Sequence, residues 1–495
     1  MRLERPPSAR RPRRWPHARA RAGVMREHAA HAPRLLEPRL PKSLELERAC
    51  SWSSLSNDSS ACSSSSARSR GGRRPLLQRL LAGMGPGLMA CLADTDGPCL
   101  ITAAQSGAQW GYSLLSLQLM LIPILFLAQE LTARLGIVRG MGMVALLRVE
   151  IGPVCAWAVS LPLLAACVLG LFSEFSIIGQ TMLLWGVPVW CSSVLAMASL
   201  LAVVATGRYA VAERAGLALG ICQVAFFATM VMAAPQANEV MRDAVSFPLG
   251  ERDFVKLVTA NIGAVIMPWM LAYQQSAICN KGLGDDERES LLLARIDTAF
   301  GCVLTQGVMA AVLVSVAATI PRGQPVGTVN HLFHVFAKVL DSESGARVLL
   351  TFAVVGACMV AAIVQTLCAA WTLEQALGRV GAAAPASPTQ EEARGIGPGE
   401  IKLSERPVFY TGCAAACGGA CAFSCLTDNA VDMSVLTEFC NGVLMPPVVF
   451  TLWYLAAHKL PAEHQLVGFQ RWMTFAVFGM CSTFCVGSIF FSFGS

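Results

Sequence analysis

The sequence predicts an all-α integral membrane protein with about eleven transmembrane helices, arranged as two inverted repeats of five helices and one additional helix. Three observations favour this fold. The 495 residues are 54% hydrophobic and 14% charged, and their mean hydropathy is +0.53, which is typical of a chain that crosses a bilayer many times. Long apolar segments recur along the chain after residue 84. The first and the sixth of these segments are interrupted at mid-length.

The apolar segments divide the chain in a regular order. The first five form repeat one, about residues 85–234, the next five form repeat two, about 257–456, and 470–492 is the additional helix. Together they form one transmembrane domain over 81–495, in which the Gly-, Pro- and Ala-rich stretch 380–406 is a flexible cytosolic linker. The expected segments are 85–108, 112–131, 154–184, 186–206, 213–234, 257–279, 296–320, 348–377, 408–426, 433–456 and 470–492.

The distribution of positive charge predicts the orientation in the membrane. Residues 1–79 contain 18 of the 38 Lys and Arg residues but only 6 of the 32 Asp and Glu residues. If this tail is cytosolic and the segments alternate, cytosolic loops carry 14 Lys and Arg residues and outer loops carry 6. This asymmetry obeys the positive-inside rule, so we expect a cytosolic N-terminus and a C-terminus on the opposite side.

The tail itself, residues 1–80, is rich in Arg, Pro and Ser and lacks hydrophobic periodicity, so we expect it to be disordered. No basic module with interleaved aromatic residues accompanies it, and nucleic-acid binding is not expected. An organellar transit peptide is one interpretation. We favour a cytosolic tail, or a start at Met25 or Met84, because five glutamates between Glu4 and Glu47 weaken the leader pattern. The sequence does not distinguish a plasma membrane from an organellar one.

The first apolar segment is interrupted by Asp94, Thr95, Asp96, Gly97 and Pro98. Proline lacks an N–H donor and clashes with the preceding turn, and glycine weakens a helix further, so the helix must break here. The break frees backbone carbonyls beside a carboxylate in the middle of the membrane. A charge at this depth costs about 2.5–3.5 kcal/mol on insertion scales and usually serves a function. We therefore expect a cation site at Asp96.

The sixth segment is interrupted in the same way. Residues 262–276 read IGAVIMPWMLAYQQS, with Pro268 in the middle. The residue before a proline, here Met267, is driven out of the helical conformation. Pro268 also frees a carbonyl one turn earlier, near Ala264. Two interrupted segments, each near the start of one half, indicate a secondary transporter built from inverted repeats.

Both interruptions resemble motifs of the natural resistance-associated macrophage protein (NRAMP) family of divalent-metal transporters, and the resemblance covers about residues 83–460. Family members carry Asp-Pro-Gly-Asn followed by Gln-Ser-Gly-Ala; here Asp96-Gly97-Pro98-Cys99 stands at the same spacing before Gln105-Ser106-Gly107-Ala108. The second family motif, Ala-x-x-Met-Pro-His-Asn, corresponds to AVIMPWM at 264–270. The resemblance is closest to members with variant sites, and it implies a LeuT-type fold with broken helices 1 and 6.

The resemblance also implies the ligands. Carried over position by position, they are Asp96, Cys99, the Met267 sulfur and the Ala264 carbonyl oxygen. Cysteine replaces the family's asparagine at 99, which exchanges an oxygen for a softer sulfur. Because a thioether contributes little to Mg²⁺ binding, we favour Mn²⁺ or Fe²⁺ as substrate. A Mg²⁺ transporter of the same family is the alternative, since the variant residues resemble that branch.

Proton coupling is expected to be weak or absent. The acidic positions of family symporters in the third segment fall on Ser173 and Ser176, and the histidine of the second motif is Trp269. Glu174 is nearby but is expected to face another side of its helix. Without a titratable relay, the metal gradient and the membrane potential would drive transport.

Other polar residues within the segments are secondary candidates. Asp94 is expected either to line the cavity around the ion or to be structural. Gln274, Gln275 and Asn441 either line the cavity or form interhelical hydrogen bonds, and Asp297 is expected to make a gating or helix-end contact. Cysteines recurring every four residues, at 413, 417, 421 and 425, form one helix face and are expected to allow close helix packing rather than to bind metal.

Competing functions remain open at this point. No phosphate loop, nucleophile elbow or HExxH motif is present, so an enzyme is not expected, and neither is a cofactor. The expected partners are divalent metal ions and the lipid bilayer; the sequence identifies no protein partner. A sodium-coupled amino-acid carrier of the same fold is one alternative, although Asp96 would repel a substrate carboxylate. A membrane protein that senses metal without moving it is another.

Overall fold

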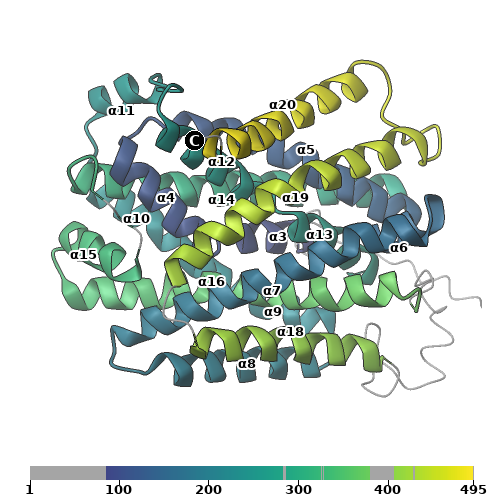
Figure 1. The fold of residues 1–495 in the computed structure, drawn as a ribbon, viewed down its shortest axis with the longest axis horizontal. Coiled ribbons are helices and arrows are strands. Elements are labelled where there is room, and N and C mark those ends of the chain that lie inside the picture. The colour runs from purple at the N-terminus through teal and green to yellow at the C-terminus, as the bar shows by residue number, and fades with distance from the viewer. Residues whose placement is uncertain are drawn as a thin grey trace, which may run out of the picture. The chain divides into compact units, whose positions relative to one another are not determined.

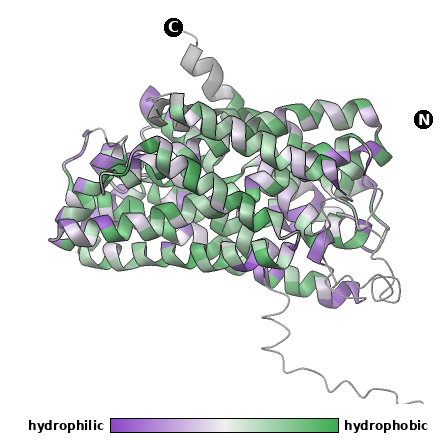
Figure 2. Cartoon of the chain, turned by 90° about the horizontal axis from the view of Figure 1, so that it is seen from below, coloured by the Kyte–Doolittle hydropathy of each residue, from purple (hydrophilic) through white to green (hydrophobic). Residues whose placement is uncertain are grey.

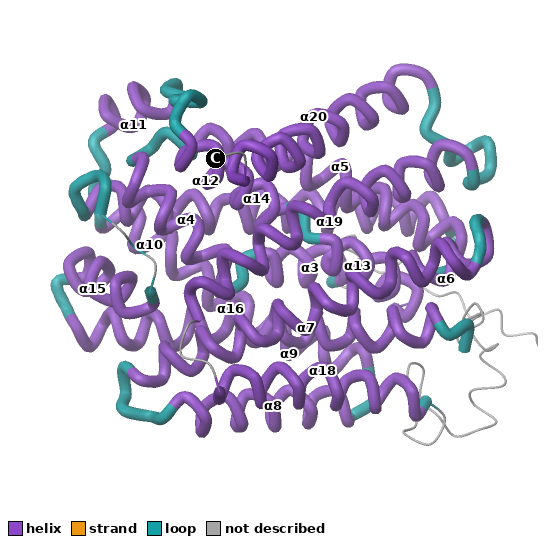
Figure 3. Tube along the Cα trace, in the orientation of Figure 1, coloured by secondary structure: helices purple, strands orange, loops and turns teal. Residues whose placement is uncertain are grey.

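The computed structural model describes residues 85–281, 286–324, 326, 328–379, 406–426 and 430–493. The predicted tail, residues 1–80, and residues 380–405 of the predicted linker lie outside these ranges. All regular elements in the described part of the chain are helices, as Figure 3 shows.

A helix or a pair of helices stands at each of the eleven predicted segments (Figure 1). Eight of the described helices are long and apolar enough to cross a membrane, and Val189–Ala205 is a shorter apolar helix. The unbroken elements are α5 (Leu115–Arg139), α7 (Pro153–Leu183), α8 (Val189–Ala205), α14 (Glu287–Thr319), α16 (Glu343–Ala376), α18 (Pro407–Leu426), α19 (Ala430–His458) and α20 (Gly468–Phe493).

The first and sixth segments are broken where the prolines predict. The first consists of α3 (Pro86–Asp94) and α4 (Gly97–Trp110), and the sixth of α12 (Arg252–Val265) and α13 (Pro268–Lys281). In both cases the proline lies within the first two residues of the second half-helix, where its missing N–H removes no intrahelical hydrogen bond. The half-helices pack pairwise, α12 against α4 and α13 against α3, so the two breaks lie side by side.

Some elements were not predicted. The fifth segment is α9 (Tyr209–Gly220) and α10 (Ala225–Met232), joined by one 3₁₀ turn at Ile221–Val224. Short helices occupy the connections after the second, fifth and seventh segments: α6 (Met143–Glu150), α11 (Ala237–Ala244) and α15 (Val329–Leu340). Their sequences are too short, or too polar on one face, to stand out against the membrane-spanning pattern.

The hydropathy of the residues varies along the lengths of the transmembrane helices. In Figure 2 the most hydrophilic residues gather toward the two ends of the helices, and the middle of the bundle is mostly hydrophobic. The broken helices are nevertheless not on the lipid side, because residues 91–104 and 261–278 around the two interruptions are all buried inside the protein. The interruptions are therefore surrounded by other helices, which is the only place where non-helical backbone is tolerated at membrane depth.

Candidate metal site

Asp96 occupies the first break because it caps the second half-helix. It has an extended backbone, and its carboxylate accepts a hydrogen bond from the Cys99 backbone N–H at 2.9 Å. Aspartate is a favoured N-cap residue because it satisfies an N–H that lacks an intrahelical partner. The cap uses one carboxylate oxygen and holds the side chain at the start of α4. Asp96 is only 2% exposed, so the charge is withdrawn from water.

The end of α3 leaves the Leu92 backbone carbonyl without an intrahelical partner, and neighbouring side chains donate hydrogen bonds to it. The Leu92 carbonyl accepts hydrogen bonds from the Thr95 hydroxyl at 3.0 Å and from the Gln223 amide at 2.9 Å. Gln223 lies in the 3₁₀ turn of the fifth segment and also contacts the Thr95 hydroxyl. The Leu92 carbonyl is therefore satisfied by neighbouring side chains, which leaves the Asp96 carboxylate as the principal group of the first break that could hold a cation.

The second break places Ala264 against the first. Cys99 donates from its thiol to the Ala264 carbonyl oxygen, with 3.3 Å between sulfur and oxygen. Met267 lies three residues later, in the break itself, and is completely buried. Gly263 allows α19 to approach α12 closely, because a Cβ there would lie 2.7 Å from the Glu438 carbonyl oxygen of α19. The close contact between α12 and α19 thus brings a third helix to the breaks.

Glu438 is the residue that this third helix contributes. Its Oε1 lies 3.8 Å from the Cys99 sulfur, and the residue is 1% exposed. Asp96, Cys99 and Glu438 each offer one ligand atom, and these atoms all lie within 4.8 Å of one another. Two carboxylates and a thiol at this separation can bind one cation. Among the described residues no other group of three or more His, Cys, Asp or Glu side chains meets this criterion.

Glu174 also faces the first break, and the prediction that it points elsewhere is wrong. Its Oε2 accepts a hydrogen bond from the Gly97 backbone N–H at 3.3 Å, and the residue is fully buried. The prediction rested on positions along an ideal helix, which do not show which side of α7 faces α4. The neighbouring Ser173 instead bonds to Thr437 of α19 at 3.0 Å.

Glu174 and Glu438 are the site residues that the sequence reasoning missed. Each is a single acidic residue within a long apolar segment, and that is a sufficient signal, because intramembrane carboxylates are costly and usually functional. With Asp94 and Asp96 they bring four buried carboxyl groups to the region of the first break. Such a concentration of acid in a water-excluded place favours a bound cation.

The secondary candidates separate into two groups. Asp94, in the last turn of α3, is buried, and neither of its carboxylate oxygens has a hydrogen-bond partner among the described residues. Asn441 lies one turn after Glu438 on α19 and is fully buried. By contrast, Gln274 makes interhelical hydrogen bonds with Thr132 and Thr298. Gln275 donates to the Met141 carbonyl in the connection between α5 and α6.

The end of α3 away from the break is held by Asp297 of α14. Its carboxylate accepts from the Gly85 and Gly87 backbone N–H groups at 3.1 and 2.8 Å. This is the predicted helix-end contact, and it satisfies N–H groups that a helix start leaves free. Nearby, Lys281 at the end of α13 forms a 2.9 Å ion pair with Glu213 of α9. Polar contacts thus hold the start of α3 and the end of α13.

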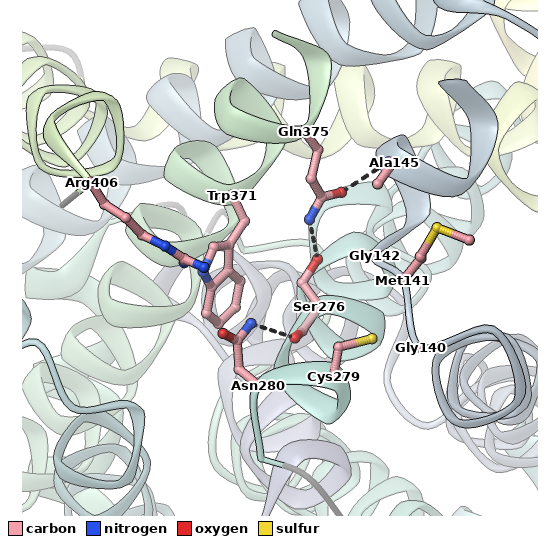
Figure 4. A pocket seen from close by; sticks show the side chains of 10 residues that line it. All are labelled: Gly140, Met141, Gly142, Ala145, Ser276, Cys279, Asn280, Trp371, Gln375 and Arg406. Atoms are coloured by element: carbon pink, nitrogen blue, oxygen red, sulfur yellow. Dashed lines mark hydrogen bonds between the residues drawn. The ribbon is translucent and has the colours of Figure 1, made fainter. Parts of the chain in front are cut away.

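A pocket opens beside the C-terminal end of α13 (Figure 4). Gln375 of α16 crosses it, donating to the Ser276 hydroxyl at 3.0 Å and accepting from the Ala145 N–H at 3.2 Å. Trp371 and Arg406 line its other side. The site residues themselves are at most 2% exposed, so the pocket does not reach them and the site is closed to solvent in this conformation.

The cysteine face of α18 packs against neighbouring helices, as predicted. Cys413, Cys417 and Cys421 are buried, and α18 packs against α7 and α16. Cys417 contacts the Thr366 hydroxyl of α16 at 3.1 Å. Cys425, at the end of the row, is exposed.

A family model for natural resistance-associated macrophage protein-like proteins matches residues 87–490. The chain belongs to this family. The match includes both breaks, Glu174 and Glu438, and it extends beyond the resemblance seen in the sequence to include α20. Membership confirms the resemblance that the two motifs indicated, and the multi-pass membrane fold follows from it.

Curated relatives in the NRAMP family include a "Divalent metal cation transporter MntH" of Latilactobacillus sakei, 30% identical over 40% of this chain and 44% of that protein. Another, of Bradyrhizobium diazoefficiens, is 28% identical over 53% of this chain and 61% of its own length. The alignments thus span about half the length of these relatives. The manganese transporter of Eremococcus coleocola, solved with an aromatic bis-isothiourea compound, has a TM-score of 0.64 at 16% identity, covering 84% of this chain and 87% of that one. This likeness confirms the predicted fold class.

Proposed function

We propose that this NRAMP-family protein moves divalent metal cations of the Mn²⁺ and Fe²⁺ type across a membrane by alternating access around its two helix breaks. The single observation that carries the proposal is the convergence of Asp96, Cys99 and Glu438 within 4.8 Å at the first break. The names of the curated relatives, divalent metal cation transporters, agree with it.

The ion is the substrate, and the residues around it supply complementary ligands. Asp96 and Glu438 provide charged oxygens, the Ala264 carbonyl and Cys99 contribute from the contact between the breaks, and Met267 adds a thioether from the second break. Asp94 and Asn441 are further oxygen donors in the same region. Oxygen ligands of this kind suit Mn²⁺, and the sulfur atoms favour transition metals over Mg²⁺ and Ca²⁺.

Alternating access requires the buried site to open to each side in turn. The closed conformation is held at one end by the hydrogen bonds from the start of α3 to Asp297 of α14, and by the Lys281–Glu213 ion pair. At the other end, Asn261 of α12 donates to the Ser106 hydroxyl of α4 at 2.9 Å and accepts from Gln118 of α5 at 2.6 Å. We infer from the charge asymmetry that the Asp297 end is cytosolic, and that the basic N-terminal tail is on that side.

Two other functions give different results in one assay. A sodium-coupled amino-acid carrier would bind a substrate carboxylate, which the acids around Asp96 would repel. A metal sensor would bind the ion but not release it on the far side. Purified protein in proteoliposomes is expected to take up Mn²⁺ and to exclude radiolabelled amino acids. Amino-acid uptake without Mn²⁺ uptake would reject the proposal, and binding without flux would favour the sensor.

We expect transport without coupled proton movement, because Ser173, Ser176 and Trp269 occupy the positions of the titratable residues in family symporters. A pH-sensitive dye inside the proteoliposomes is expected to show no acidification as Mn²⁺ enters. Glu174 is a buried acid that faces the break, so it is the residue at which a coupled proton would be carried. Acidification that tracks Mn²⁺ uptake and disappears in Glu174→Gln would contradict uncoupled transport and assign the proton to Glu174.

A further inference from the structure

A second set of soft ligands lies along α3, away from the helix break. Cys91 of α3 and Cys302 of α14 are both completely buried, and their sulfur atoms are 3.9 Å apart. Gly301 makes this approach possible, because a Cβ there would lie 2.7 Å from the Cys91 sulfur. The two thiols therefore meet where α3 and α14 are in close contact.

A third donor atom adjoins the thiol pair. The Gln129 side chain of α5 accepts from the Cys91 thiol through its amide oxygen, with 3.3 Å between sulfur and oxygen. The amide nitrogen of the same side chain donates to the Met270 sulfur of α13 at 3.4 Å. Three helices thus bring two thiols and an amide oxygen together, and Met270 of a fourth helix holds the amide that supplies this oxygen.

The spacing of the two thiols matches a metal site. In a tetrahedral site with metal–sulfur bonds of about 2.3 Å, two thiolate ligands lie about 3.8 Å apart. The observed separation is 3.9 Å. Thiolates and thioethers prefer soft cations, and an amide oxygen completes such a set without adding charge.

Asp94 connects this cluster with the break. It lies three residues after Cys91 on α3, which places both side chains on one face of the helix. Its carboxylate is 1% exposed and has no hydrogen-bond partner among the described residues. A cation that leaves Asp96 along α3 would therefore meet an unpaired carboxylate first and the thiol pair next.

We propose that Cys91 and Cys302, with the Gln129 amide oxygen beside them, form a second cation site that binds soft thiophilic ions such as Cd²⁺. Binding forms two cadmium–sulfur bonds and releases the two thiol protons to solvent. The ion then joins α3 to α14. Because α3 is one of the half-helices that must move for the buried site to open, we expect the bound soft ion to arrest transport. This consequence for transport rests on the proposed function, whereas the binding does not.

Binding is measured on the purified full-length protein by the ultraviolet thiolate-to-cadmium charge-transfer absorbance. Titration with Cd²⁺ is compared between Cys91→Ser/Cys302→Ser and the matched control Cys413→Ser/Cys481→Ser, which removes two buried thiols from α18 and α20. We expect the first variant to lose the tightest component of the titration and the control to retain it. Equal titrations would overturn the proposal. The single variant Cys302→Ser gives the same comparison if the double variant does not fold.

Arrest is measured as Cd²⁺ inhibition of Mn²⁺ uptake at saturating Mn²⁺, where competition at Asp96 is suppressed. Each variant is referred to its own uptake without Cd²⁺. Because disturbing even an outer contact of a metal ligand costs about 10–100-fold in affinity, Cys302→Ser is expected to raise the half-inhibiting Cd²⁺ concentration at least about tenfold. An unchanged concentration would reject the arrest. If the protein moved no Mn²⁺, the proposed function would fail, and the absorbance titration would still decide the second site.

Discussion

The two helix breaks have the same backbone design but different chemistry. Each has a proline at the start of its second half-helix, and each is enclosed by other helices. The first break contains Asp96, has Asp94 in the last helical turn before it, and faces Glu174 and Glu438 from neighbouring helices. The second break, at 266–267, contains no charged side chain and presents the Ala264 carbonyl oxygen and the Met267 sulfur.

This difference indicates a division of labour between the breaks. Attraction of a doubly charged ion into the membrane requires negative charge, which the first break concentrates. Discrimination among divalent ions depends on the softness of the ligands. Under the proposed function, the Met267 sulfur would provide that softness from the second break. Substitutions in the first break should therefore affect binding of all divalent ions, whereas substitutions in the second should affect the choice among them.

The largest effect is expected for Asp96→Ala. It removes the carboxylate that caps α4 and the charge nearest to Cys99, so Mn²⁺ uptake should fall to the background of empty proteoliposomes. Uptake of radioactive or fluorescence-detected Mn²⁺ measures it. Asp94→Asn is the matched control, because it removes a buried carboxylate two residues away and should retain measurable uptake. Normal flux in Asp96→Ala would exclude this residue as a ligand.

Glu438→Gln should have the next largest effect. The amide keeps the shape of the side chain but removes one of the two carboxylates that meet at Cys99, so the Mn²⁺ concentration for half-maximal uptake should rise about tenfold, on the scale for perturbed metal sites. Glu438→Asp, which keeps the charge, should be less impaired. If the two variants behave alike, the charge of Glu438 does not contribute to binding, and the acid-rich description of the first break is incomplete.

Met267→Ala should have a smaller effect on total flux but should change its selectivity. Losing the thioether removes a preference for softer ions, so Mg²⁺ or Ca²⁺ uptake relative to Mn²⁺ should increase several-fold. Met445→Ala removes another buried methionine, whose sulfur accepts a hydrogen bond from Ser482, and serves as the control. An unchanged ion preference in Met267→Ala would mean that this sulfur is not a ligand, and the division of labour between the breaks would not hold.

The positions of both breaks could be predicted from single residues. Pro98 and Pro268 remove N–H donors wherever the surrounding helices lie, so local covalent structure was sufficient. The meeting of Asp96, Cys99 and Ala264 followed from a resemblance rather than from the residues alone. Glu174 could not be placed correctly, because the facing of α7 depends on its packing against α4 and α19. Gln274 and Gln275 each left two roles open, because their hydrogen-bond partners lie on other helices or in the connection between α5 and α6.

The sequence by itself therefore determined the membrane-spanning character, the order of the segments and the two places where the helix must break, because hydropathy and proline act over a few neighbouring residues. The tertiary structure decided which acids surround the first break and which thiols meet beside it. Glu438 lies 339 residues from Cys99 and Cys302 lies 211 residues from Cys91. Contacts across such separations depend on how entire helices pack, and no local pattern encodes that geometry.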